Sequence, residues 1–252
     1  MNKVIETMMQ HRTRRSFVKG SELPKEHLEQ IIACSKQGSC WMNGQHYSII
    51  VATGDTKQKI ADLIKDKAPG NAAHIESSAA FLVYCIDYSN IKLSFDIEGG
   101  DFDISNQYEP LLIGSMDVGI AMQNAALAAE SFGYGIVYCG GVRGFAKGIS
   151  ELLNIPENAL FLCGLSIGVI DEEKSTEKVK PRLPHEANVG YNEFPKSNEE
   201  VLKQYRQTMI DFAEARETKT WTKKFADFYA QPSGIEKVTK ELLEKKGFVN
   251  NR

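Results

Sequence analysis

The chain has 252 residues, of which 42% are hydrophobic and 25% are charged, as in an ordinary globular protein. This composition excludes disordered, collagen-like and disulfide-scaffold proteins. The 30 Lys and Arg residues nearly balance 33 Asp and Glu residues, and the formal net charge is −3, which argues against a nucleic-acid binder that depends on bulk positive charge. We expect a soluble enzyme or binding protein with one large domain, or one domain with an appendage.

The sequence carries no signal for a metal, a membrane span or export. Five scattered cysteines include no CxxC pair, and the five histidines have no metal-like spacing. The N-terminus lacks an apolar run of signal-peptide length, and the longest apolar stretch, Leu111 to Phe132, contains Asp117 and Glu130. We therefore predict no metal, no membrane, no nucleic acid and a cytoplasmic location.

Helical and strand patterns alternate along the first part of the chain. The strand at 80–86 is apolar on both faces and is therefore expected at the centre of a sheet. Residues 87–109 contain many acids and a Gly-Gly pair, which predicts an excursion or a mobile loop. Other helices are predicted at 3–10, from Leu23-Pro24-Lys25 to Gly38 and around 57–65, with a strand at 47–52.

The second part centres on a long helix, Leu111 to Ser131, that is apolar around its whole circumference. Such a helix is expected to be buried on every side, in the core or in a subunit interface. Strands separated by helices indicate an α/β or α+β sheet covered on both faces. Further strands are predicted at 136–138 and 159–170, and helices at 145–153 and near 198–216, 220–229 and 234–246.

Two basic segments are candidate phosphate sites. His11-Arg12-Thr13-Arg14-Arg15-Ser16 combines arginines, whose planar guanidinium groups match phosphate oxygens, with a hydroxyl group. In Lys178 to Pro184, prolines on either side of Arg182 hold the backbone extended, so that Lys180 and Arg182 project to one side. A solvated basic patch and an ordinary charged turn are the alternatives.

Two loops are candidates for binding a flat ring. Gly38 to His46 joins a helix to a strand and contains Asn and Gln amides, which can read the edge of a heteroaromatic ring. Tyr138-Cys139-Gly140-Gly141 follows a strand, and its glycines let the backbone approach a flat ligand closely. Tight polar turns without a ligand would give the same patterns.

Several familiar catalytic motifs are absent from the sequence. It contains no GxSxG elbow between a strand and a helix, because Gly164 to Gly168 (GLSIG) falls inside the strand predicted at 159–170. It also contains no Walker A loop, no HExxH and no GxGxxG between a strand and a helix. Nothing nearby in the sequence activates Cys40 or Cys139 as a nucleophile, so a thiol enzyme is disfavoured.

The order HRTRRSF, GSCWMNGQHYS, YCGGVRG and KPRLP resembles the nitroreductase family of FMN enzymes, in particular its NADPH-dependent, oxygen-insensitive nitroreductase and flavin reductase subgroup. The resemblance runs from about Val4 to Pro184 and more loosely beyond. It implies an α+β fold with a central mixed, mainly antiparallel sheet flanked by helices. It also implies an FMN-binding core at 1–184, a helical extension at 185–252 that packs on the partner subunit, and a homodimer with the long helix at its interface.

The resemblance also assigns roles to individual residues. The first basic segment and the KPR segment would bind the ribityl chain and phosphate, and the two loops would border the flavin ring. Arg216 is the nearest match to the arginine that selects NADPH. The implied FMN-binding residues are His11, Arg12, Thr13, Arg15, Ser39, Cys40, Asn43, Gln45, Tyr138, Cys139, Gly140, Gly141, Lys180 and Arg182.

The sequence departs from the family pattern in two flavin-bordering places. Many relatives have Pro where this chain has His46, and Asn71-Ala72-Ala73 stands where the subgroup tends to carry a flavin-facing Gln. The chain is also shorter after Arg216, which leaves its preference for NADPH over NADH open.

The implied activity is transfer of a hydride from NADPH or NADH through flavin N5 to nitroaromatics or quinones, with ping-pong kinetics. The flavin carries this chemistry, so no catalytic side chain is assigned. The alternatives are a flavin reductase that supplies reduced FMN and a non-catalytic FMN-binding protein.

Overall fold

The computed structural model describes residues 2–212 and 218–249. The chain divides into two compact units, Met1–Ser175 with Gly234–Arg252, and Thr176–Ser233. The sequence predicts a core at 1–184 and an extension at 185–252. The structure differs in that the last helix, α11 (Gly234–Lys245), belongs to the first unit, where it contacts η2 (Gly140–Phe145) and α7 (Ala146–Leu152). Burial of Leu242 and Phe248 in the core of that unit explains the return.

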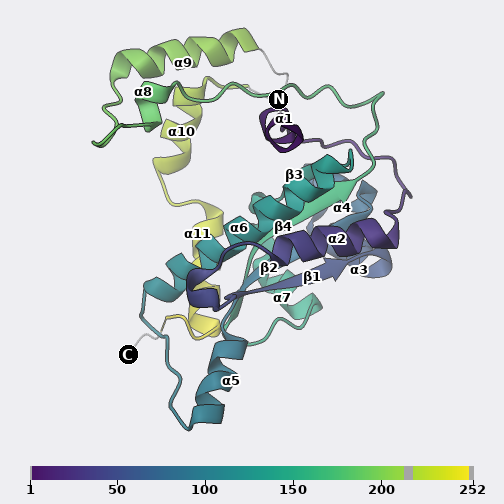
Figure 1. Ribbon diagram of the computed structural model, residues 1–252, viewed down its shortest axis with the longest axis vertical. Helices are drawn as coiled ribbons and strands as arrows, with labels where there is room; N and C mark the ends of the chain where they lie inside the picture. Colours follow the sequence, from purple (N-terminus) through teal and green to yellow (C-terminus); the bar gives the residue numbers. More distant parts are fainter. Residues whose placement is uncertain (1, 213–217, 250–252) are drawn as a thin grey trace. The chain divides into compact units, whose positions relative to one another are not determined.

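The first unit is built on a four-stranded sheet of order β1-β2-β4-β3 (Figure 1). Its strands are β1 (Tyr47–Ala52), β2 (Ala80–Asp87), β3 (Gly135–Tyr138) and β4 (Ala159–Gly168). The predicted α+β class is confirmed, but every pairing among the described strands is antiparallel rather than mixed. The central place of β2 is also confirmed, since all its residues but the last are buried.

Helices surround this sheet, including two that periodicity did not predict. One of these, α5 (Ser89–Glu98), occupies the predicted excursion; it buries no residue, so it has no core-facing stripe to reveal it. The other, α4 (Pro69–Ser77), begins at a proline and buries only two residues, Ala72 and Ile75. The remaining helices of this part are α1 (Lys3–Met9), α2 (Lys25–Lys36), η1 (Trp41–Asn43), α3 (Gly54–Ile64) and α6 (Glu109–Ser131).

The long helix α6 has one buried face and one exposed face within the single chain. Its buried side carries small and apolar residues such as Val118 and Ala125, together with one acid, Asp117. On the other side Leu112 is 63% exposed and Met116 is 48% exposed. Burial on every side therefore does not hold for one chain. By length and composition alone, α6 is the one helix among the described residues that would pass for a membrane span.

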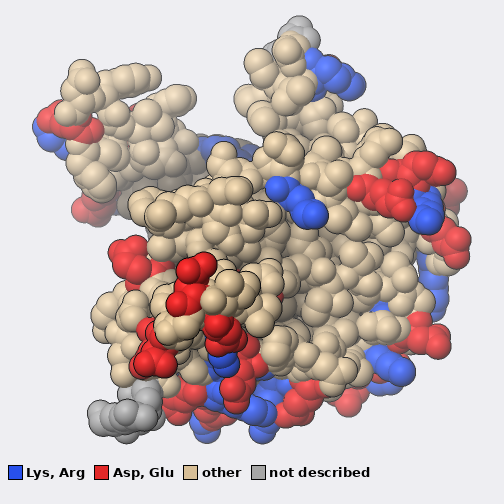
Figure 2. Space-filling view, turned by 60° about the horizontal axis from the view of Figure 1, so that its bottom comes forward, with Lys and Arg blue, Asp and Glu red and all other residues tan. Residues whose placement is uncertain are grey.

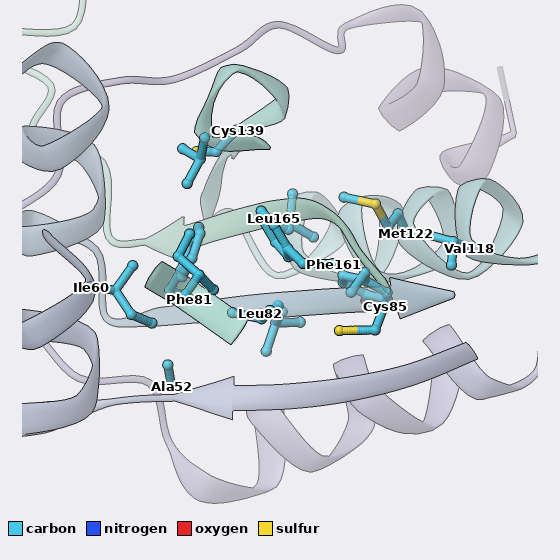
Figure 3. Packing of buried hydrophobic residues seen from close by; sticks show 14 of the residues in the cluster. Ala52, Ile60, Phe81, Leu82, Cys85, Val118, Met122, Cys139, Phe161 and Leu165 are labelled. Atoms are coloured by element: carbon cyan, nitrogen blue, oxygen red, sulfur yellow. The ribbon is translucent and has the colours of Figure 1, made fainter. Parts of the chain in front are cut away.

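The core packs the sheet against α6 and also includes buried residues of α3, α4 and α7, such as Ile60, Ile75 and Ile149. Figure 3 shows Phe81, Leu82 and Phe161 on the central strands, with Val118 and Met122 contributed by α6. All of these side chains are at most 3% exposed. Close packing of this kind fixes α6 against the sheet and makes the helix a rigid support for the loops at its edge.

The second unit contains α8 (His185–Asn188), α9 (Glu199–Phe212) and α10 (Trp221–Tyr229). Its centre is aromatic: the Trp221 ring lies 5.4 Å from that of Tyr205 and 5.0 Å from that of Phe225. The predicted continuation of α9 to 216 falls at 213–217, outside the described residues.

Charges of both signs are interspersed on the surface. Figure 2 shows Lys, Arg, Asp and Glu alternating along the lower edge of the view, around a largely uncharged centre. This distribution agrees with the near-neutral composition and gives no continuous basic area on the face shown.

Candidate functional site

The first basic segment follows α1 and enters the sheet region at an isolated bridge between Phe17 and Ile170. Arg14, only 9% exposed, donates its backbone N–H to Ile136 and a guanidinium N–H to the hydroxyl of Ser175 at 2.7 Å. These contacts occupy Arg14 within the protein and give it a structural role. Its neighbours His11, Arg12, Thr13 and Arg15 remain the candidate ligand contacts.

His11 and Arg12 lie toward the end of α6. The Nδ1 atom of His11 is 2.7 Å from Oε1 of Glu130, while Oε2 of Glu130 is buried without a partner. Arg12 donates to the Gln10 carbonyl oxygen at 3.1 Å and lines a cavity of about 310 Å³ with Glu130 and Tyr134. The segment therefore places cationic and imidazole groups around one unsatisfied carboxylate oxygen.

Arg15 lies on the side of the glycine turn. Its positive charge is among the influences that lower the pKa of Cys139, although burial dominates and raises that pKa to about 12. The backbone N–H of the adjacent Arg14 donates to the Ile136 carbonyl oxygen at 3.0 Å, which places the segment against β3 and the turn that follows it. Two segments that are far apart in the sequence, the arginine cluster and the turn after β3, are therefore brought together.

The glycine turn is anchored in the sheet. The Cys139 N–H donates to the Gly164 carbonyl oxygen at 2.8 Å, and the Cys139 thiol is fully buried beside the Ser166 hydroxyl at 3.7 Å. Tyr138 donates its hydroxyl to Oε1 of Gln123 on α6 at 3.0 Å. Cys139 is thus a packed, protonated thiol, and the glycines that follow it are the part of the turn free to face a ligand.

A hydrogen-bond donor lies close to each of these glycines. A Cβ atom added at Gly140 would come no closer than 3.7 Å to a guanidinium nitrogen of Arg143, and one added at Gly141 no closer than 3.5 Å to the side-chain amide nitrogen of Asn71. Sequence reasoning left Asn71 in doubt and missed Arg143. No local pattern pairs α4 with the turn after β3, so only the fold reveals these donors.

The loop between α2 and β1 has an unusual backbone. Met42, Asn43 and Gln45 all have positive φ angles, 49°, 57° and 51°, a conformation that non-glycine residues rarely adopt. The Gln45 side-chain amide donates to the Asn43 carbonyl oxygen at 3.2 Å. Ser39, Asn43 and Gln45 are exposed, so the polar groups predicted to border a ring are accessible.

Cys40 lies half-buried at the start of this loop. Burial raises the pKa of its thiol, and the negative charge of Asp117 raises it further. The thiol lies 3.5 Å from the Gly38 carbonyl oxygen. It is therefore protonated near neutral pH, as expected of a residue that packs or lines a site rather than one that attacks a substrate.

Helix α6 supports three of the four predicted segments. Asp117 accepts hydrogen bonds from the loop at 39–46, Gln123 from Tyr138, and Glu130 pairs with His11. At a rise of 1.5 Å per residue, these three contacts span about 20 Å of the helix. The long helix therefore connects the loop, the turn and the basic segment within the first unit.

The fourth segment belongs to the second unit. Its Pro181 carbonyl oxygen accepts the Tyr205 hydroxyl at 3.0 Å, Lys180 is half-buried and Arg182 is exposed. Lys178 lies 5.8 Å from the centre of the Phe212 ring. Arg216 falls outside the described residues, so its predicted role stays a prediction.

Comparison with known proteins assigns the chain to a family. Residues 8–169 match the nitroreductase family, and residues 180–251 match the C-terminal domain of that family. The chain is 35% identical to a Cr(VI) reductase of Pseudomonas sp. (strain G-1), over 97% of this chain and 98% of that protein. It is 33% identical to an FMN reductase [NAD(P)H] of Bacillus subtilis (strain 168), over 98% of each.

A solved structure extends this likeness to the fold. The NADPH:FMN oxidoreductase from Vibrio harveyi, complexed with NAD+, matches with a TM-score of 0.85 and 33% identity over 99% of this chain and 100% of that one. Family match, identity over nearly the full length and fold agree with the four motifs and their order. The chain belongs to the nitroreductase family.

Proposed function

We propose that the protein is an FMN-dependent oxidoreductase that transfers electrons from NAD(P)H to a small organic acceptor such as a nitroaromatic or a quinone. The observation that carries this proposal is that one helix, α6, makes hydrogen bonds to an amide-bearing loop, to the tyrosine that begins the glycine turn and to a basic segment. Relatives named FMN reductase and NADPH-flavin oxidoreductase support the same cofactor and donor.

The residues of the first unit suit FMN. Gly141 is exposed, so its backbone can lie against a flat ring, and the Asn71 amide and Arg143 guanidinium nearby provide N–H donors for ring nitrogen or carbonyl atoms. Arg15, near Cys139, provides a cation of the kind that binds a phosphate. When bound, FMN would supply the two-electron redox chemistry that no side chain of the site offers.

Each predicted site residue then has a positioning or electrostatic role. We assign phosphate and ribityl binding to His11, Arg12, Thr13 and Arg15, and the family pattern predicts the same role for Lys180 and Arg182. The glycine turn would give backbone N–H groups to the ring, and the loop at 39–46 would read its edge. Fixed dipoles and cations of this kind stabilise negative charge on a ligand without reorganising.

We also propose a homodimer. Helix α1 buries no residue, and its Val4 and Met9 are 58% and 68% exposed; on α6, Leu112 and Met116 are 63% and 48% exposed. Between the two helices lies a largely apolar groove of about 350 Å³. A second copy of the chain is the occupant we propose, and the variant with Leu112→Glu and Met116→Glu should then be monomeric by light scattering. A parent protein that is itself monomeric would contradict this assignment.

Steady-state kinetics tests the proposed reaction. With NADPH as the donor and a nitrofuran or quinone as the acceptor, we expect parallel double-reciprocal lines, since donor and acceptor would use one slot in turn. Intersecting lines that require a ternary complex would contradict the mechanism.

A flavin reductase is the second candidate, because relatives of that name match nearly the full length of the chain. Comparing turnover of free FMN with turnover of the nitro compound distinguishes the two enzymes. Absence of any NAD(P)H oxidation would indicate a flavin-binding protein without catalysis. Cytoplasmic location and a preference for NADPH through Arg216 complete the proposal.

A further inference from the structure

One buried carboxylate, Asp117, ties together both ends of the loop that precedes β1. Its Oδ1 atom accepts the backbone N–H of Trp41 at 3.1 Å, and its Oδ2 atom accepts the backbone N–H of His46 at 3.2 Å. The same Oδ2 lies 2.9 Å from Nδ1 of the His46 ring. The carboxylate is 1% exposed, and these three donors satisfy it.

The His46 ring completes this arrangement. A carboxylate only accepts hydrogen bonds, so Nδ1 of His46 is protonated and donates its N–H to Asp117. The ring also lies 4.9 Å from that of Tyr88, and a Cβ atom at Gly44 would stand 2.2 Å from the ring's Cε1 atom. Gly44 therefore leaves room for the His46 ring to pack against the backbone of the loop, and the ring of Tyr88 also packs against the His46 ring.

The backbone between the two anchors is strained. Met42, Asn43 and Gln45 hold positive φ angles, and such residues persist only where their surroundings enforce them. The glycine at the start of the loop is equally constrained, because a Cβ atom at Gly38 would lie 2.8 Å from Ile120 of α6. Without the three hydrogen bonds to Asp117, the segment would relax to more favourable backbone angles.

We propose that Asp117 is a positioning residue which, with His46, locks residues 41–46 so that the Asn43 and Gln45 amides are held ready for the ring of a bound flavin. This inference rests on the proposed FMN function for its ligand, but the lock itself exists in the free protein. Asp117 does not touch the ligand; it acts through the backbone of the loop. A preorganised loop spares the binding free energy that ordering it would otherwise cost.

Trp41 provides a direct probe of the loop. The chain has two tryptophans, and Trp221→Phe leaves Trp41 as the sole indole. In flavin-free protein with this background, Asp117→Asn should lower the Trp41 fluorescence anisotropy, because the single carboxamide oxygen of Asn can accept from Trp41 or from His46 but not from both ends of the loop. The dissociation constant for FMN should rise about tenfold, equivalent to one lost hydrogen-bonded anchor.

Two further variants keep the test decisive. His46→Phe keeps the ring and the backbone N–H but removes the Nδ1 donor, and should give a smaller change of the same sign even if Asp117→Asn fails to fold. Ser35→Ala is the matched control, since it removes buried hydrogen bonds from Ser35 to Ala121 of α6 and to Tyr84 without touching the loop. It should lower stability and leave both the anisotropy and the FMN affinity unchanged.

The inference is overturned if Trp41 anisotropy is the same in the parent and in both loop variants. It is also overturned if the loop loosens while FMN affinity stays constant, or if Ser35→Ala produces the same changes. A parent protein that binds no FMN would refute the proposed function instead, and the anisotropy in flavin-free protein would still decide whether Asp117 holds the loop.

Discussion

The two loops predicted to border the ligand are held by different means. The turn at 138–141 is an extension of the sheet: its backbone bonds to β4, and its one thiol is packed in the core. The loop at 39–46 bonds to the sheet only at its last residue, where the His46 carbonyl oxygen accepts the Asp87 N–H of β2 at 3.1 Å. Its earlier part is tied to the side chain of Asp117, from a helix more than 70 residues away in the sequence. One region is fixed mainly by the sheet and the other mainly by a buried acid.

This difference predicts how each region responds to change. The backbone of the turn at 138–141 is held by its hydrogen bonds to β4, so loss of one side chain should not displace it. Ligand binding at the turn is instead disturbed by a larger side chain in place of a glycine. Disturbing the loop at 39–46 requires only the loss of one acceptor. The turn therefore sets the room available for a ligand, whereas the loop sets how precisely polar groups meet the edge of that ligand.

The largest expected effect is steric. Gly141→Val would fill the space over the turn, so we expect FMN affinity to fall about 100-fold, or about 2.8 kcal/mol. The backbone at Gly141 is not in the positive-φ region, so the fold should tolerate valine. Fluorescence titration with FMN measures the effect. Gly144→Val in the same helical turn, whose Cβ atom would lie 3.7 Å from Ile235, is the control and should bind FMN normally.

The next effect concerns the basic segment at 11–16. Arg15→Ala removes a cation near the turn, and we expect FMN affinity to fall by about 1.5–3 kcal/mol through loss of a charge-assisted hydrogen bond. Lys19→Ala, which removes an exposed cation paired with Glu76, should bind FMN like the parent. Equal affinities for the parent and Arg15→Ala in the titration would refute the phosphate assignment.

The sequence predicts the turn better than it predicts the loop. Ile136 to Tyr138 followed by two glycines is a local pattern, and the strand, the turn and its exposed glycines are all present. In the sequence, Asp117 is an acidic residue within an apolar helix. This predicts that its carboxylate has a buried partner, but it does not identify that partner. Asn71 and Arg143 meet the turn through tertiary packing, which periodicity cannot reveal.

The smallest effect compares the two thiols. Burial raises the pKa of Cys139 from 9.0 to about 12, so the folded chain keeps a proton that the unfolded chain loses above pH 9. This stabilisation is complete below about pH 9 and is lost progressively as the pH rises from there toward 12.

At pH 10 the ionisation of Cys139 in the unfolded chain should therefore cost about 1.4 kcal/mol of stability. Urea unfolding at pH 8 and pH 10 should show a smaller drop for Cys139→Ala than for the parent. Cys40→Ala, at a half-buried thiol, should reduce the drop less. The reverse order would show that the loop, and not the turn, is the more rigidly packed region.

The central claim is that the aligned turn, loop and basic segment hold FMN and exchange electrons with NAD(P)H. Its most direct test is to titrate flavin-free protein with FMN and then add NADPH in the absence of oxygen, following the visible absorption of the flavin. We predict saturation near one FMN per chain and complete bleaching on addition of NADPH, or of NADH in its place. A protein that binds no FMN, or whose bound FMN keeps its colour with both donors, would contradict the claim.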